Sequence, residues 1–254
     1  MKRIATAAVL IPLVVFAIFS NIWWVLLAFV ALVAMACWYE YANLFELHWL
    51  TLMMGAAGGL ALLVIPIEHV IIPLVIFSLI TLTLPFRDED LQAGMSRAAI
   101  MFVGLVYIFG AMKSGYQLGI LQPLLLLFAL AINWVGDTGA YYVGKRFGKH
   151  KMAPRISPGK SWEGAAASIL FAALFTTIGM HLFLNTPLLK AATFGILGNI
   201  AGQIGDLAES AMKRGAGVKD SGTLLPGHGG MLDRVDSALF TLPVAFAIAR
   251  WMHL

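Results

Sequence analysis

Residues 206–236 read DLAESAMKRGAGVKDSGTLLPGHGGMLDRVD, and this polar stretch stands between two apolar runs. It combines acidic and basic side chains, a histidine and several glycines in a chain of which only 12% of the residues are charged. An ionised side chain at the centre of a membrane helix costs about 2.5–3.5 kcal/mol on insertion scales. A cluster of such side chains beside apolar segments therefore indicates a functional site.

The residue types in this stretch favour a particular ligand. Asp206, Asp233 and Asp236 fall on segments predicted to be helical, with Lys213 and Arg214 between them. Carboxylates suit a hard cation such as Mg²⁺, whereas Lys and Arg suit phosphate. The stretch predicts a site for a metal-bound, polyphosphate-like anion.

Composition predicts an all-α, polytopic membrane protein. The 254 residues are 60% hydrophobic and only 12% charged, whereas about 25% of the residues of a soluble domain are charged. The single Cys37 lies in an apolar run, so there is no disulfide framework. Apolar runs of about 20 residues, the length that spans a bilayer, predict about nine spans. They cover about 4–19, 22–45, 50–67, 69–86, 96–114, 119–144, 164–184, 188–212 and 231–251.

Lys and Arg predict the orientation. With the N-terminus in the cytoplasm, most of them fall on inner loops, as the positive-inside rule requires. Residues 1–95 then form N-terminal spans, and residues 96–254 form a catalytic membrane region with cytoplasmic loops 145–163 and 213–230. Polar side chains from separate spans come to one level, the cytoplasmic third of the membrane: Asn133, Asp137, Gln203, Asp206, Asp233 and Asp236.

Helical spacing gives the metal hypothesis and its alternative. Asp206, Ser210 and Lys213 recur at three to four residues, so they share a helix face. Asp206 and Asp233 on two facing helices would bind one cation. The alternative is a set of interhelical ion pairs, for example Asp206 with Arg234.

Glycines surround His228 just before the last span. Gly229 and Gly230 let main-chain N–H groups approach an anion, and the N-terminus of the last span points to the same place. His228 is interpreted as a phosphate donor, a metal neighbour or a turn residue. Glu40, in the second span, is interpreted as a residue near the membrane interface.

Loop 145–163 is basic, which positive-inside topology and attraction to anionic lipid already explain. Ser157, Lys160 and Ser161 are more specific, because hydroxyls beside Lys before a span suit phosphate. The glycines in 55–59 predict close helix packing.

The stretch Ser210-x-x-Lys213-Arg214-x₄-Lys219-Asp220-x₅-Pro-x-His228-Gly229-Gly230-x-x-Asp233-Arg234-x-Asp236 resembles the signature of phosphatidate cytidylyltransferases, also called CDP-diacylglycerol synthases. Residues 137–141, 144–149 and 157–164 resemble the same family. In the last of these, Gly159 and Ser161 stand where the family usually has Lys and Thr.

The resemblance implies a reaction of CTP with phosphatidic acid that yields CDP-diacylglycerol and pyrophosphate, with Mg²⁺ and a second cation such as K⁺. Asp206 and Asp233 are then assigned to Mg²⁺, with Asp236, Asp137 and Asp220 as helpers. The residues assigned to hold or orient phosphates are Lys213, Arg214, Lys219, Arg234, Ser210 and His228.

The predicted partners are CTP, phosphatidic acid and membrane lipid, with no nucleic acid; a homodimer is left open. The predicted location is a bacterial inner membrane. One alternative is a CTP-dependent polyprenol or phytol kinase, which would need a base for the hydroxyl proton. The other is an ion-coupled transporter, which should show repeated halves and charges at mid-membrane.

Overall fold

Each predicted apolar run forms a helix in the computed structural model, which describes residues 2–225, 227 and 229–254. Short turns η1 (Ile67–His69), η2 (Leu84–Arg87) and the π-helical η3 (Val106–Gly110) link some of them. The α-helices are α1 (Lys2–Phe19), α2 (Trp23–Leu44), α3 (Trp49–Val64), α4 (Ile71–Thr81), α5 (Leu91–Leu105), α6 (Ala111–Leu121), α7 (Pro123–Phe147), α8 (Trp162–Leu184), α9 (Leu188–Gly215) and α10 (Leu232–Met252).

Within the described residues, five helices are long and apolar enough to cross a membrane. They are α2, α7, α8, α10 and the continuous Leu91–Leu121 helix, which consists of α5, η3 and α6. The chain is therefore a helical, multi-pass membrane protein. The shorter or more polar helices α1, α3, α4 and α9 complete the predicted set, so the number of about nine spans stays a prediction.

Local signals explain where several helices begin. Asp90 caps α5, accepting hydrogen bonds from the backbone N–H groups of Gln92 at 2.9 Å and Ala93 at 3.2 Å. Pro123 opens α7, where its missing N–H costs nothing. Ser161 caps α8 by accepting from the Gly164 N–H at 3.2 Å.

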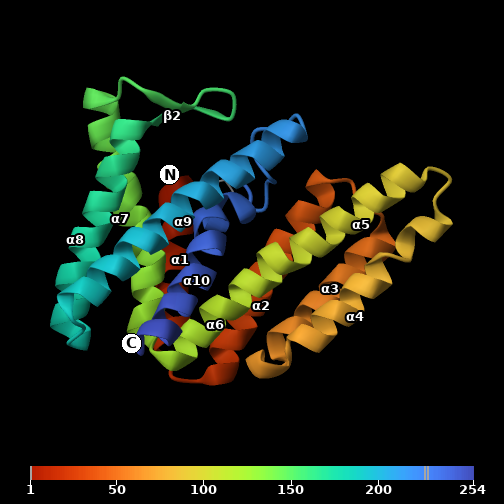
Figure 1. Cartoon of the computed structure of the whole chain (residues 1–254), viewed down its shortest axis with the longest axis horizontal. Coiled ribbons are helices and arrows are strands. Elements are labelled where there is room, and N and C mark those ends of the chain that lie inside the picture. Colours follow the sequence, from red (N-terminus) through yellow and green to blue (C-terminus); the bar gives the residue numbers. More distant parts are fainter. Residues whose placement is uncertain (1, 226, 228) are drawn as a thin grey trace.

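The helices form two groups that α10 joins. Helices α7, α8 and α9 pack closely on one side, α2 to α5 lie on the other, and α10 contacts α6, α7 and α9 (Figure 1). Trp38, Tyr41 and Phe109 are fully or almost fully buried between α2, α3 and α5–η3. A Cβ atom on Gly55 would collide with Trp38, and one on Gly59 with Phe109. The prediction of close helix packing at residues 55–59 is confirmed.

The two polar segments differ in extent from the predicted loops. Helix α7 continues to Phe147, and strands β1 (Lys151–Ala153) and β2 (Ser157–Ser161) form an antiparallel hairpin before α8. Helix α9 continues to Gly215, because Lys213 and Arg214 suit the negative end of a helix. The N-terminus, the hairpin and the end of α9 all lie at the same end of the molecule (Figure 1).

Candidate active site

A cavity of about 580 Å³ opens between α7, α8, α9 and the β1–β2 hairpin. Asp137 of α7, Asp206 of α9 and Lys160 of β2 line it together. These residues lie far apart in the sequence, and the packing of α7 against α8 and of α8 against α9 brings them to one place. The cavity therefore combines carboxylates and a cation beneath the hairpin.

Deeper in the same cavity, uncharged polar side chains bond one another. Gln203 donates to the side-chain oxygen of Asn199 at 2.7 Å, and Asn199 donates to the Ser168 hydroxyl at 3.0 Å. Asn133, which also lines the cavity, accepts from the Thr241 hydroxyl at 3.0 Å. This satisfied network keeps one wall of the cavity polar among membrane helices, where a polar group without a partner is costly.

Asp206 forms an ion pair with the hairpin. Its Oδ2 lies 2.5 Å from the Lys160 ammonium, and its Oδ1 accepts a long hydrogen bond of 3.4 Å from Ser210. Both ionic side chains are partly exposed, at 27% for Lys160 and 32% for Asp206. Asp206 does take part in an ion pair, but its partner is Lys160 rather than Arg234, whose side chain is exposed.

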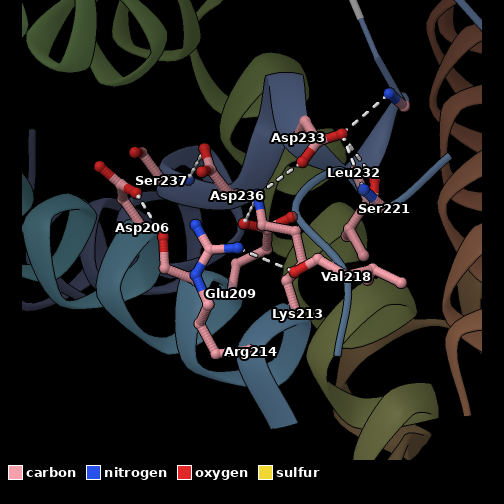
Figure 2. Close-up of polar contacts among 12 residues, drawn as sticks. Asp206, Glu209, Lys213, Arg214, Val218, Ser221, Leu232, Asp233, Asp236 and Ser237 are labelled. Atoms are coloured by element: carbon pink, nitrogen blue, oxygen red, sulfur yellow. Dashed lines mark hydrogen bonds and ion pairs between the residues drawn. The ribbon is translucent and has the colours of Figure 1, made fainter. Parts of the chain in front are cut away.

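Asp233 is held by several donors at once (Figure 2). Its Oδ1 accepts from the Lys213 ammonium at 2.6 Å. Its Oδ2 accepts from the Gly230 N–H at 2.8 Å and from both the N–H and the hydroxyl of Ser221 at 3.0 Å. Lys213 also pairs with the fully buried Glu209 at 2.5 Å. Asp233 therefore joins α9, α10 and the segment between them.

Asp236 lies between Asp206 and Asp233 (Figure 2). It accepts from the adjacent Ser237 N–H at 2.6 Å, and its charge interacts with those of Asp206, Asp137 and Lys213. Across the described parts of the chain, no three His, Cys, Asp or Glu side chains are grouped closely enough to hold a metal ion among themselves. The carboxylates of Asp137 on α7, Asp206 on α9 and Asp236 on α10 nevertheless lie near enough to repel one another.

Other predicted residues lie outside this centre. The Arg214 guanidinium donates to the Val218 carbonyl at 2.9 Å, which secures the end of α9. Lys219, Asp220 and Arg234 are exposed. A Cβ on Gly229 would come within 2.9 Å of Asp233, so this glycine permits the close turn around that carboxylate.

Predicted residues of the hairpin divide into two kinds. Lys160 and Ser161 line the cavity, and Ser161 is also the cap of α8. Ser157 lies on β2 but is not part of the cavity lining. The prediction for His228 falls outside the described residues.

Several site residues were absent from the sequence-based set. Asn199 precedes Gln203 by four residues, so helical spacing carried a signal for it. Glu40 and Ser221, which contact the α10 N-terminus and Asp233, carried none. Their partners lie in distant parts of the chain or in an irregular segment without periodicity.

Comparison with known proteins gives the family. A model of the cytidylyltransferase family matches residues 1–252. An uncharacterized protein of Escherichia coli K12, YnbB, is 32% identical over 246 residues, which cover 90% of this chain and 80% of the relative.

Two relatives are named phosphatidate cytidylyltransferase. The protein of Bacillus subtilis 168 is 39% identical over 157 residues, covering 61% of this chain and 57% of the relative. That of Staphylococcus epidermidis RP62A is 41% identical over 163 residues, covering 63% and 59%. The match thus spans less than two thirds of the length of these two proteins. The chain belongs to the cytidylyltransferase family, a family of CTP-dependent nucleotidyltransferases.

Proposed function

We propose that this protein is a phosphatidate cytidylyltransferase that makes CDP-diacylglycerol and pyrophosphate from CTP and phosphatidic acid. One observation carries the proposal: Asp137, Asp206 and Lys160 meet in one cavity at one end of a bundle of membrane helices. A reaction between a lipid and a water-soluble nucleotide needs a site of this kind, close to the membrane surface. The location proposed is the cytoplasmic face of a bacterial inner membrane.

The chemistry is a displacement at phosphorus. A phosphate oxygen of phosphatidic acid forms a bond to the α-phosphorus of CTP, the bond from that phosphorus to the bridging oxygen breaks, and pyrophosphate leaves. The attacking phosphate is already ionised, so no general base is required. The main obstacle is electrostatic, because two unit charges of the same sign 4 Å apart repel by about 4 kcal/mol at an effective dielectric of 20.

Lysine ammonium groups of this chain would offset part of that repulsion. Lys160 stands at the cavity, and Lys213 lies between Glu209 and Asp233. Phosphate oxygens entering the cavity would compete with Asp206 for Lys160, whose ion pair is partly exposed and therefore exchangeable. Lys219, Arg214 and Arg234, all exposed, are available to phosphates arriving from solvent.

The carboxylates fit a magnesium ion that arrives with the nucleotide. Mg²⁺ is commonly bound by one or two carboxylates together with substrate phosphates, so a ready-made group of three protein ligands is not required. Asp206 and Asp236 are the proposed ligands, with Asp137 near them. Asp233, which the sequence assigned to Mg²⁺, already accepts from Lys213, Gly230 and Ser221 and would instead hold the site together, and Asp220 is exposed outside the centre. The cation would neutralise charge on the phosphates. K⁺ is proposed as a second cation.

Purified protein in detergent, with Mg²⁺, K⁺, phosphatidic acid and CTP labelled at the α-phosphate, tests the proposal. Label should enter the lipid, pyrophosphate should be released, and chelation of Mg²⁺ should stop both. Asp206→Asn should abolish transfer, whereas Glu46→Gln, an equivalent change at an exposed position, should not. Label that remains in soluble CDP would contradict the proposal and support the lipid kinase.

A further inference from the structure

Glu40 is a buried acid on a membrane helix that the reaction described above does not use. It lies in the last turns of α2, and only 2% of its surface is exposed. Burial of an ionised carboxylate is costly unless hydrogen bonds compensate for the lost water. The partners of Glu40 therefore indicate what it is for.

Those partners all belong to the segment that leads into α10. Oε1 accepts from the Met231 N–H at 2.9 Å. Oε2 accepts from the Leu232 N–H at 2.8 Å and from the Ser221 hydroxyl at 3.2 Å. Leu232 is the first residue of α10, whose opening N–H groups have no partner within the helix. Glu40 thus caps α10 from another helix, where the helix dipole also favours a negative charge.

The backbone of this segment is shaped around the carboxylate. A Cβ atom on Gly222 would lie 2.6 Å from Oε1 of Glu40, and one on Gly230 would lie 2.5 Å from Oε2. Both distances are too short for an ordinary contact, so the glycines are what let the chain close around Glu40. Gly222 and Gly230 of the polar stretch therefore leave room for the carboxylate of Glu40.

Ser221 links Glu40 to the candidate active site. Its hydroxyl lies 3.2 Å from Glu40 and 3.0 Å from Asp233, and its N–H also donates to Asp233. One hydroxyl proton serves one acceptor at a time, so the two carboxylates share it. The position of Asp233 is therefore coupled to that of Glu40 through Ser221 and through the first turn of α10.

We propose that Glu40 is a positioning residue: it caps α10 from α2 and thereby holds Ser221, Asp233 and residues 229–232 in the geometry that nucleotidyl transfer needs. This inference rests on the proposed function. It gives the N-terminal helices a part in the site, since α2 supplies the cap while α9 and α10 supply Asp206, Asp233 and Asp236.

Two variants disturb the contact in different ways. Glu40→Gln keeps the size of the side chain but removes the charge and places an amide NH₂ group against backbone N–H donors. Gly222→Ala keeps Glu40 and pushes the segment away from it. The matched controls are Glu46→Gln, an exposed acid just after α2, and Gly215→Ala, where an added Cβ meets nothing within 4 Å.

Hydrogen exchange gives a readout that does not depend on activity. In the full-length protein in detergent, the amide hydrogens of residues 231 and 232 should exchange faster in Glu40→Gln than in wild type. Exchange in α8, which Glu40 does not cap, should stay unchanged. Equal protection of residues 231 and 232 in the two proteins would overturn the cap, whether or not the protein transfers a cytidylyl group.

Kinetics then separate positioning from simple stability. At a temperature at which both proteins are folded, kcat for cytidylyl transfer should fall on the order of 100-fold in Glu40→Gln, as expected when a reacting geometry shifts by about 1 Å. The Mg²⁺ concentration for half-maximal rate should rise, and Gly222→Ala should change both in the same direction. A lower melting temperature with unchanged kcat and Mg²⁺ dependence would leave Glu40 purely structural.

A failure of the Glu40 proposal can be told apart from a failure of the proposed reaction. Wild type without cytidylyl transfer overturns the proposed reaction, and the exchange experiment then decides the cap alone. If Glu40→Gln does not fold, Gly222→Ala and Ser221→Ala carry the same comparison. Wild-type kinetics in both of these variants would overturn the positioning role.

Discussion

Aspartates that look alike in the sequence have different surroundings. Asp233 accepts from Lys213, Gly230 and Ser221, so its oxygens already have protein donors. Asp236, one helical turn later, accepts from the Ser237 N–H, and its charge interacts with the repelling charges of Asp206 and Asp137 and with the attracting charge of Lys213. The first is suited to holding the site together, and the second is suited to a cation brought by the substrate.

Replacing each aspartate by asparagine should separate these roles. Asp233→Asn leaves the largely buried Lys213 without one of its carboxylates, and breaking a buried ion pair costs about 3–5 kcal/mol. Asp236→Asn removes a repelled charge and should leave the melting temperature in detergent unchanged or higher. Both should abolish cytidylyl transfer. Equal melting temperatures for the two variants would show that the Asp233 contacts contribute little.

At the scale of the element, the β1–β2 hairpin brings a cation to the cavity. Lys160 reaches Asp206 from β2, and Gly159 beside it also lines the cavity. The sequence did not predict this hairpin, because Pro158 and Gly159 are poor strand residues and β1 has only three residues. Pairing across the hairpin, a non-local effect, is what makes the segment extended.

The open space at Gly159 allows a gain of function to be tested. A Cβ there meets nothing within 4 Å, so Gly159→Lys should fold normally and add a positive charge at the cavity. The KM for CTP should fall by a factor of about two to five at low salt, the equivalent of the up to about 1 kcal/mol of an exposed ion pair. The gain should vanish in 1 M salt. A salt-independent change in KM would contradict the electrostatic explanation.

Lys113 of α6 stabilises another element, away from the hairpin. This buried side chain donates to the Leu63 carbonyl at 3.1 Å and also to the Ile65 carbonyl, which secures the end of α3. Lys113→Met should destabilise the protein by about 1–3 kcal/mol, because buried carbonyls lose their donor. Transfer activity per folded molecule should not change.

The neighbouring Ser114→Ala is the control for this variant, since the Ser114 hydroxyl donates to the Gly110 carbonyl of the same continuous helix. Thermal unfolding in detergent makes the comparison. Equal melting temperatures for the two variants would show that Lys113 does not secure α3.

At the scale of the whole molecule, the N-terminus, the hairpin and the end of α9 share one end (Figure 1). With the N-terminus in the cytoplasm, a cysteine at Lys151 should react with a membrane-impermeant maleimide in inside-out vesicles but not in intact cells. A cysteine at Glu68, between α3 and α4, should show the reverse. Reaction of both from the same side would contradict the topology.

Wild type provides the control for this labelling. Its single cysteine, Cys37, is fully buried in α2, so the unmodified protein should stay unlabelled from either side. Labelling of wild type would require a cysteine-free background before the two positions could be compared.

The sequence by itself determined the helical membrane architecture. It also predicted that Asp137, Asp206 and Gln203 lie at one depth in the membrane. These features depend on local properties: apolar length and the spacing of residues along one helix. Their meeting in one cavity agrees with that reasoning.

Only the tertiary structure decided which partner each charged group has. The pairing of Asp206 with Lys160, the donors around Asp233 and the cap from Glu40 join segments far apart in the chain, up to 192 residues for Glu40 and Leu232. No periodicity records such contacts, because they depend on how the helices pack against one another. The surroundings of each carboxylate, and with them its role, follow from that packing.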